Sequence, residues 1–401
     1  MAAYTFSEGT SRLLSFVFYV VAARMLTTDG FGVLRYTIAL ALLALGAVQV
    51  LVTAMTRELG ATRGDPARTG EVLGSGLAVA AVLFAVTSAL CVLASLLGLT
   101  GSAYLPGLLV VLAGLSVFQL YYAVGRGLGD HRRAVVSYAG GSIAQLTLLL
   151  LLAAVSDPGA RVVLVVFGVS SALPLVPYEL IRPAVLGAPL RVSRESVRRL
   201  WRVGGPLVLA QAGFLVWLSA DQIWVESTLG TREIGLYGGA KNVVQIFMVL
   251  PTAATGVLLP RVAELRISQQ TTRARRLLYA TTVGVIALSA LVGAAVLLAR
   301  SELLGELYGA QYAAAAPALV GLTLGMVAYA GLVTVTHGAV GWGRPGLYAL
   351  GMLLAVPLEI GCLLAFGGDH SSVAGWASGA SMMIAFALVL LRMRGRPLEE
   401  G

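Results

Sequence analysis

The chain has 401 residues, of which 58% are hydrophobic and 12% are charged, and its net charge is +9. Soluble domains carry about twice that share of charged residues, so the composition excludes a soluble fold and indicates a polytopic membrane protein. The basic excess requires no nucleic-acid partner, because positive charge in such proteins marks cytoplasmic loops and attracts anionic membrane lipids.

Twelve apolar runs reach the length of about 20 residues that a helix needs to cross a bilayer. We therefore expect an all-α polytopic membrane protein with 12 transmembrane helices. In chain order the runs cover residues 7–26, 33–56, 72–97, 106–125, 134–155, 161–178, 203–224, 235–259, 278–299, 317–340, 346–366 and 372–391.

The distribution of Lys and Arg predicts the orientation. If the N-terminus is cytoplasmic, the inner connections hold 21 of the 28 basic residues, and the outer ones hold only Arg161, Arg232 and Arg300. Short loops rich in Lys and Arg stay on the cytoplasmic side. Both termini are therefore expected in the cytoplasm. A single lysine beside 27 arginines is typical of a GC-rich bacterial genome, so we expect a bacterial cytoplasmic membrane.

Short echoes indicate a duplicated chain. Leu26 followed by Phe31-Gly32 in the first hairpin matches Leu229 followed by Ile234-Gly235 half a chain later. Two halves of six helices that start on the same side would be parallel six-helix bundles, related by a pseudo-two-fold axis along the membrane normal.

Three domains follow: an N-terminal bundle (1–178), a cytoplasmic linker (179–202) and a C-terminal bundle (203–401). Within the linker, Ser193 is a typical N-cap for a short amphipathic helix that ends near Trp201. Its arginines and apolar face predict that it lies along the membrane surface. It is either a topology anchor or an element that moves during function.

The first two runs contain arginines at membrane depth, where a charge costs about 2.5–3.5 kcal/mol at a helix centre. Arg12, Arg24 and Arg35 lie in or at the edge of these runs, and Gln49 follows on the second. Arg24 could pair locally with Asp29; otherwise these side chains point into a cavity suited to an anion.

The eighth run has one polar face that starts at Lys241 and Asn242 and continues through Gln245. Lys241 either lines a wet cavity, extends toward the interface, or pairs with a carboxylate such as Asp221 of the preceding run. Asp221 is itself a candidate proton or sodium site, or a counter-ion of Lys241 or Arg24. Gln119 adds a polar group in the fourth run.

No enzyme signature is visible in the sequence. There is no phosphate-binding loop, no His and Cys cluster with metal spacing, and no long outer loop with paired acids. We therefore expect a protein that is not an enzyme and that needs no cofactor or metal. Cys91 and Cys362 both lie inside predicted helices, so no disulfide is expected.

The chain resembles the Wzx-type polysaccharide and oligosaccharide flippases of the multidrug/oligosaccharidyl-lipid/polysaccharide (MOP) superfamily. The resemblance is in short motifs at corresponding places of both halves: Arg12-Leu13-Leu14, Ala23-Arg24-Met25-Leu26, Phe31-Gly32, Thr56-Arg57, Asp221, Leu229, Ile234-Gly235-Leu236-Tyr237, Ala240 and Pro260-Arg261. It implies a transporter that moves a polyprenyl-diphosphate-linked oligosaccharide from the cytoplasmic to the outer leaflet, by alternating access through a cationic central cavity.

The resemblance also suggests which residues serve the substrate. Guanidinium and ammonium groups suit a diphosphate, whereas amides suit sugar hydroxyls. The predicted substrate-binding residues are Arg12, Arg24, Arg35, Lys241, Gln49, Gln119, Gln245 and Asn242. Asp221 is the predicted site of proton or sodium coupling. The partners implied are the lipid-linked glycan, membrane lipids and, in one reading, proteins of polysaccharide assembly.

Three alternatives stay open. A proton- or sodium-driven multidrug or metabolite exporter of the same superfamily would need acids in its cavity, whereas the intramembrane charge here leans basic. A membrane glycosyltransferase or polymerase would need a large outer loop, and all the outer connections are short. A silent scaffold for an assembly complex would bind partners without transport.

Overall fold

The computed structural model describes residues 2–62, 64–98, 100–185, 187, 189–342, 346–368 and 370–395. Every element in these ranges is a helix, in agreement with the all-α prediction. Arg63, Arg344 and Arg396, which contribute to the predicted charge asymmetry, lie outside the described residues.

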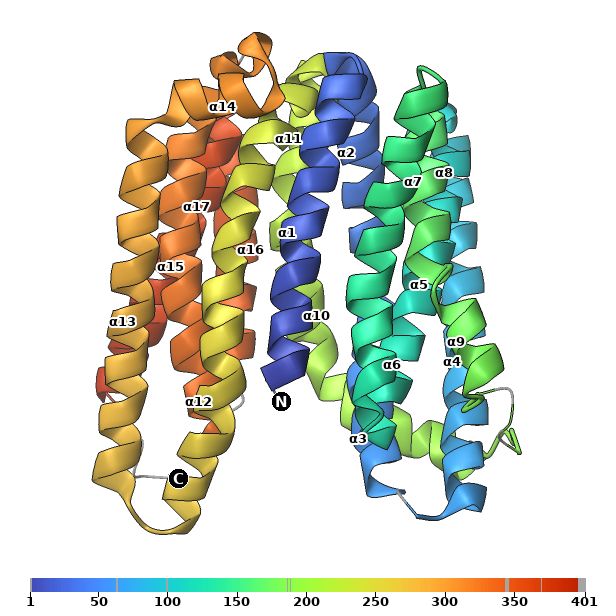
Figure 1. Cartoon of the computed structure of the whole chain (residues 1–401). Helices are drawn as coiled ribbons and strands as arrows, with labels where there is room; N and C mark the ends of the chain where they lie inside the picture. Colours follow the sequence, from blue (N-terminus) through green and yellow to red (C-terminus); the bar gives the residue numbers. More distant parts are fainter. Residues whose placement is uncertain are drawn as a thin grey trace. The chain divides into compact units, whose positions relative to one another are not determined.

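The helices are drawn in Figure 1. The first part of the chain forms α1 (Ala2–Met25), α2 (Thr28–Ala44), α3 (Gly46–Ala61), α4 (Pro66–Leu96), η1 (Ser102–Tyr104), α5 (Leu105–Leu128), α6 (His131–Val135), η2 (Val136–Gly140), α7 (Gly141–Val155), α8 (Ala160–Ala172) and α9 (Leu175–Ile181). The remainder forms α10 (Arg194–Leu229), α11 (Thr231–Gln245), η3 (Ile246–Met248), α12 (Val249–Ile267), α13 (Thr271–Leu298), α14 (Arg300–Tyr308), η4 (Ala310–Ala315), α15 (Ala316–Gly341), α16 (Gly346–Phe366) and α17 (Ser372–Gly395).

The helices long and apolar enough to cross a membrane number 9 among the described residues, or 10 if the bent pair α2 and α3 is one span. The chain is thus a multi-pass membrane protein by length and composition. The predicted runs 7–26 and 203–224 are helical within α1 and α10 but are not among these spans. Side chains of residues 2–8 and 203–210 lie outside the description, so the count of twelve stays a prediction.

Helix breaks correct one detail of the prediction. The single helix expected over 33–56 is wrong, because α2 and α3 meet at Leu45 with a bend of 50°. Gly46 follows the break, and glycine resists such a change of direction least. Prolines coincide with two other breaks: α8 ends just before Pro174, and the tight η3 turn precedes Pro251, which has no N–H to donate to the preceding turn. Pro357, by contrast, lies inside α16.

The predicted linker helix differs from the structure in one respect. Ser193 does cap a helix, since its hydroxyl accepts the Ser196 amide at 3.4 Å. That helix is the first part of α10, which runs on to Leu229, rather than a short separate helix. The helix continues through Gly204, Gly205 and Pro206, although these residue types usually end a helix. Its placement along the membrane surface stays a prediction.

The helices gather into two compact units. The N-terminal unit comprises Met1–Phe18 and Val33–Ala212, and the C-terminal unit comprises Tyr19–Gly32 and Gly213–Gly401. The turn between α1 and α2 therefore packs with helices that come much later in the sequence. The domain boundaries predicted at residues 178 and 203 stay a prediction.

Close helix crossings in the two units repeat each other. In the N-terminal unit, a Cβ on Gly114 of α5 would lie 1.8 Å from the carbonyl oxygen of Gly168 on α8. In the C-terminal unit, a Cβ on Gly321 of α15 would lie 2.5 Å from the carbonyl oxygen of Gly375 on α17. The second glycine follows the first by the same number of residues in both units. Small residues let membrane helices approach closely, and their recurrence is what a duplicated chain predicts.

A reciprocal contact joins the two segments whose sequences echo each other. A Cβ on Gly32 would lie 1.9 Å from the carbonyl oxygen of Thr231, and a Cβ on Gly235 would lie 2.2 Å from that of Thr28. Each threonine precedes the neighbouring glycine of its own helix by four residues. The two helix starts, of α2 and α11, thus exchange equivalent contacts within the C-terminal unit. The symmetry of the whole chain stays a prediction.

Candidate functional site

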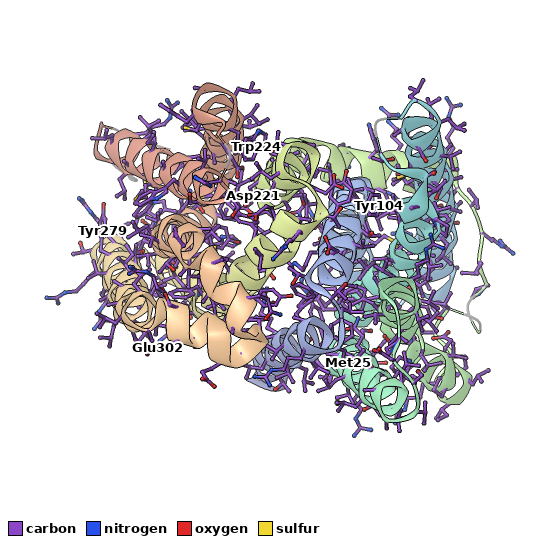
Figure 2. The ribbon with its side chains drawn as sticks, turned by 90° about the horizontal axis from the view of Figure 1, so that it is seen from above. Met25, Tyr104, Asp221, Trp224, Tyr279 and Glu302 are labelled. Carbon is purple, nitrogen blue, oxygen red and sulfur yellow. The ribbon has the colours of Figure 1, made fainter. Side chains whose placement is uncertain are left out.

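A buried ion pair lies inside the C-terminal unit. Lys241 of α11 places its Nζ 2.5 Å from Oδ2 of Asp221 on α10 and donates to the carbonyl oxygen of Leu218 at 2.8 Å. The exposed fractions of Asp221 and Lys241 are 0% and 4%. Figure 2 shows Asp221 among the helices of this unit. Of the alternatives left open for Lys241, the structure shows the pairing with Asp221.

Further groups satisfy the Asp221 carboxylate. The Tyr237 hydroxyl donates to Oδ2 at 2.5 Å, and the Gln222 amide donates to Oδ1 at 2.7 Å. Tyr237 stands four residues before Lys241, so one face of α11 presents both donors. A buried carboxylate needs such a set, because its desolvation is offset only by a close counter-charge and hydrogen bonds.

A second acid lies near this pair. Glu359 of α16 has an exposed fraction of 0%. Its carboxyl group lies close enough to Asp221, Lys241 and the Ser378 hydroxyl to interact with them electrostatically. Neither of its oxygens meets the distance and angle of a full hydrogen bond to a described residue. One cation therefore faces two acids in the interior of the C-terminal unit. The sequence shows Glu359 only as an isolated polar residue, because nothing in it brings the eleventh run next to the seventh.

Arg24 caps a helix. Its Nε donates to the carbonyl oxygen of Leu307 at 2.8 Å, and its Nη2 donates to that of Glu306. These carbonyls end α14, where the helix dipole favours a positive charge. The local pair with Asp29 that the sequence suggests is replaced by this contact, and Asp29 lies instead in the first turn of α2.

Asn242 lies in a polar and aromatic cluster beside this cap. Its side-chain amide, buried on α11, donates to the Tyr308 hydroxyl at 2.7 Å. Phe31 packs against Tyr308 and Tyr312, with ring centroids 6.4 and 6.0 Å away. These residues fix the α1–α2 turn to the end of α14. Gln245, three residues farther along α11, is half-buried.

The other predicted site residues lie in the N-terminal unit. Arg35 on α2 is buried, with an exposed fraction of 3%, whereas Arg12 on α1 is half-buried. Gln49 on α3 is half-buried and Gln119 on α5 is buried. Arg12 and Arg35 thus belong to the N-terminal unit, whereas Arg24 and Lys241 belong to the C-terminal unit.

A charged cluster that sequence reasoning missed fixes the start of the linker. Arg133, with an exposed fraction of 1%, pairs with Glu179 and donates to the carbonyl oxygen of Arg182 at 2.6 Å. Glu179 in turn accepts the amides of Ala184 and Val185 at 2.9 and 2.6 Å. The sequence counts Arg133 as a loop charge and gives no signal of its burial. The cluster is structural, since it satisfies the backbone of the chain that leaves α9.

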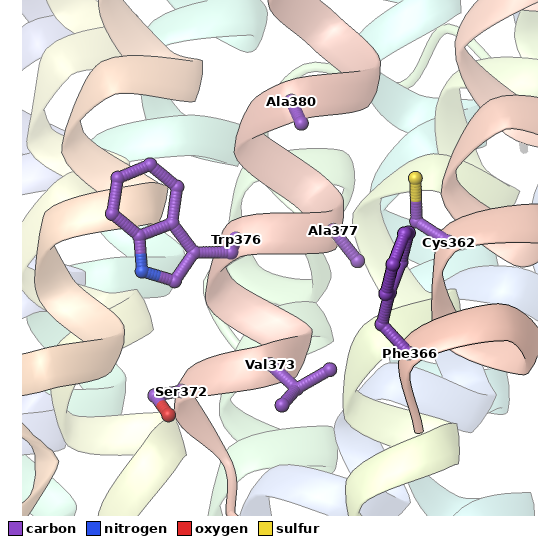
Figure 3. A pocket seen from close by; sticks show the side chains of 7 residues that line it. All are labelled: Cys362, Phe366, Ser372, Val373, Trp376, Ala377 and Ala380. Atoms are coloured by element: carbon purple, nitrogen blue, oxygen red, sulfur yellow. The ribbon is translucent and has the colours of Figure 1, made fainter. Parts of the chain in front are cut away.

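A lateral pocket of about 310 Å³ opens between α16 and α17 of the C-terminal unit (Figure 3). Its lining is apolar apart from one thiol and one hydroxyl: Cys362, Phe366, Ser372, Val373, Trp376, Ala377 and Ala380. Such a lining suits hydrocarbon. Among the residues that the structure describes, no group of three His, Cys, Asp or Glu side chains is placed to hold a metal ion.

Comparisons with known proteins bear on both the family and the fold. The family model described as polysaccharide biosynthesis protein matches residues 1–266. No curated protein matches the chain.

Several solved structures share the fold. The inward-facing conformation of a multidrug resistance MATE family transporter of the MOP superfamily is 16% identical with a TM-score of 0.76, over 100% of this chain and 99% of that chain. The outward-facing conformation is 17% identical with a TM-score of 0.68, over 100% and 96%. Lipid II flippase MurJ in an inward closed conformation is 11% identical with a TM-score of 0.78, over 98% and 88%.

These neighbours are transporters and a flippase rather than enzymes, and at such identities the likeness concerns the fold. The family model covers more than half of the chain, including the α1–α2 hairpin, the Asp221–Lys241 pair and the reciprocal glycine contact. The chain therefore belongs to the polysaccharide biosynthesis protein family and has the fold of the MOP superfamily.

Proposed function

We propose that the protein flips a polyprenyl-diphosphate-linked oligosaccharide from the cytoplasmic to the outer leaflet of a bacterial cytoplasmic membrane. Transport proceeds by alternating access through a cationic central cavity, with both chain termini in the cytoplasm. The observation that carries the proposal is the polysaccharide biosynthesis family match over residues 1–266. The fold shared with a lipid II flippase supports it, because that neighbour is named for a lipid substrate.

The chemistry of the N-terminal unit fits a diphosphate. Arg12 lies on α1 and Arg35 lies on α2. A guanidinium pairs with phosphate oxygens through two parallel hydrogen bonds, and more strongly away from water. We assign Arg12 and Arg35 to the diphosphate. Gln49, Gln119, Gln245 and Asn242 are the amides proposed for the glycan.

The buried cluster of the C-terminal unit fits ion coupling. In the structure Lys241 is held by Asp221, so its charge serves a substrate only when that pair opens. A proton on Asp221 would release Lys241, which links the two roles proposed for this pair. Glu359 is the proposed proton carrier, since a buried carboxyl without a full hydrogen bond is far less costly neutral than charged. For Arg24 we propose a different role. Because its guanidinium caps the end of α14, it holds the α1–α2 turn in place.

Flipping should depend on the arginines of the N-terminal unit. We expect Arg35→Gln and Arg12→Gln each to lower the flipping rate by about 10- to 100-fold, because each removes charge-assisted hydrogen bonds worth about 1.5–3 kcal/mol. The measurement is the flipping of a fluorescent polyprenyl-diphosphate oligosaccharide in proteoliposomes. Arg57→Gln is the matched control, since Arg57 is an exposed arginine at the end of the same hairpin.

The proposal fails if the wild-type protein moves none of several lipid-linked glycans, or if Arg57→Gln slows flipping as much as Arg35→Gln. Folding is checked by the thermal midpoint of each variant in detergent. A flipping rate that falls in both Arg12→Gln and Arg35→Gln, while the thermal midpoint of each variant stays unchanged, supports a diphosphate site.

The response to a pH gradient should depend on Glu359. We expect Glu359→Gln to fold with unchanged or higher stability, because glutamine resembles the protonated acid, and to lose the acceleration that an imposed pH gradient gives the wild type. The matched control is Glu264→Gln, an exposed acid paired with Arg261 at 2.7 Å. A variant at Glu359 that keeps the full response would remove this residue from the coupling.

One further candidate function is favoured by a specific observation. The similarity in fold to the MATE transporters covers 100% of this chain and so includes the C-terminal unit. That unit holds the two buried acids Asp221 and Glu359. A proton- or sodium-coupled multidrug or metabolite exporter is therefore the second candidate. Export of small organic cations without any glycan flipping would favour it.

A further inference from the structure

A shallow groove of about 620 Å³ runs along one face of α13. It is lined by Thr272, Arg275, Arg276, Tyr279, Ala280 and Val283. Residues at such spacings lie above one another on a helix, so the groove follows the helix axis for about 16 Å. The opposite face of α13, with Ala274, Leu278 and Thr282, is buried in the C-terminal unit.

The end of the groove nearest the α12–α13 connection carries an excess of positive charge. The connection between α12 and α13 and its flanks hold five arginines and one acid, Glu264. Glu264 pairs with Arg261, and Arg273 donates to Gln270 at 2.8 Å. Among the described residues, neither Arg275 nor Arg276 makes an ion pair. Both are exposed, so two positive charges face the groove without an acidic partner in the part of the chain that the structure describes.

The groove changes from basic to aromatic to apolar along the helix. The Arg275 guanidinium lies 5.7 Å from the centroid of the Tyr279 ring. Beyond it the exposed side of the helix carries Val283, which is 64% exposed, and then Leu291, eight residues farther along. Figure 2 shows Tyr279 at the periphery of its unit, pointing away from the helices. Tyrosine is typical of the membrane interface, so the arginines lie at headgroup depth and the apolar part at acyl-chain depth.

This order matches the order of groups in a phospholipid. We propose that the α13 groove binds one anionic phospholipid, with its phosphate on Arg275 and Arg276 and an acyl chain along Ala280 and Val283. The net negative charge of the headgroup attracts these two arginines more strongly than the zwitterionic headgroup of a neutral phospholipid does. None of the residues proposed for the substrate lines this groove, and the inference does not depend on the proposed substrate.

The test is a lipid titration followed by native mass spectrometry of the full chain in detergent, with phosphatidylglycerol and phosphatidylcholine as probes. An arginine in contact with the lipid headgroup contributes about fivefold to the affinity for an anionic lipid, so Arg275→Gln with Arg276→Gln should weaken phosphatidylglycerol binding roughly 25-fold. The matched control is Arg266→Gln with Arg273→Gln, which removes the same charge from the same connection outside the groove. It should weaken binding less than about fivefold.

If the two double variants lost equal affinity for phosphatidylglycerol, the attraction would come from the overall charge of the connection and the proposed site would be wrong. Equal affinity of the wild-type protein for phosphatidylcholine and phosphatidylglycerol would also overturn the proposal. A second measurement locates the lipid. A photoreactive benzoylphenylalanine in place of Val283 should crosslink phosphatidylglycerol, and the same group in place of Val257, an exposed apolar residue of α12, should do so at least about fivefold less. Crosslinking of equal yield at the two positions would contradict the proposal.

Discussion

Replacing Asp221 by asparagine is expected to lower the free energy of unfolding by about 3–5 kcal/mol, the usual effect of removing one partner from a buried ion pair. Lys241 would lose the carboxylate that lies closest to it and keep the Leu218 carbonyl oxygen as an acceptor, and the Tyr237 hydroxyl would lose a carboxylate acceptor. The measurement is chemical unfolding in detergent followed by tryptophan fluorescence.

Two comparisons make this prediction specific. Asp221→Leu combined with Lys241→Met removes both charges and should recover most of the lost stability, because a buried pair replaced by apolar groups is often neutral. Glu264→Gln breaks an ion pair whose partners are both more than 60% exposed, and it should change stability by less than about 1 kcal/mol. An Asp221→Asn variant as stable as this control would show that the pair is not buried in the folded protein.

The second large effect is expected at the reciprocal glycine contact. Gly32→Ala and Gly235→Ala should each destabilise the protein by about 3 kcal/mol, at the upper end for overpacking, since the new Cβ would lie 1.9 or 2.2 Å from a backbone oxygen. A backbone atom cannot turn away as a side chain can, so the starts of α2 and α11 must separate. The thermal midpoint of each variant measures the change.

The matched control is Gly284→Ala, in a helix where a Cβ would meet nothing within 4 Å. There alanine should be neutral or stabilising by up to about 1 kcal/mol. The double variant Gly32→Ala with Gly235→Ala should be less destabilising than the sum of the single variants, because one separation of the helices relieves both clashes. Strict additivity would contradict a shared contact.

The fold class followed from the sequence because long apolar runs leave few alternatives in a membrane. The end of α8 just before Pro174 has a similar local cause, because proline donates no backbone hydrogen bond. The break at Leu45 did not follow from the sequence, because no proline marks it. The continuation of the linker helix into α10 did not follow either, because Gly204, Gly205 and Pro206 usually end a helix.

The candidate site was harder to predict because its chemistry depends on contacts between distant segments. The sequence offered Asp221 as one counter-ion of Lys241, and the structure shows that pair. It could not show Arg24 at the end of α14, since the two are separated by 283 residues and a helix end offers no charge pattern. The burial of Glu359 and Arg133 could not be predicted for the same reason. The residues next to a charged side chain in the sequence do not show whether it is buried or exposed.

The α1–α2 turn has a consequence for the order in which the protein is made. Tyr19–Gly32 is synthesised well before Thr231 and Leu307, yet it packs in the unit that contains them. At 5–20 residues per second, Arg24 waits roughly 15–60 s for the carbonyl oxygens that it caps. The turn therefore reaches its final contacts only after much of the C-terminal unit has been synthesised. During that interval the Arg24 guanidinium and the face of Gly32 lack the partners that they have in the folded protein, and they are open to whatever assists insertion.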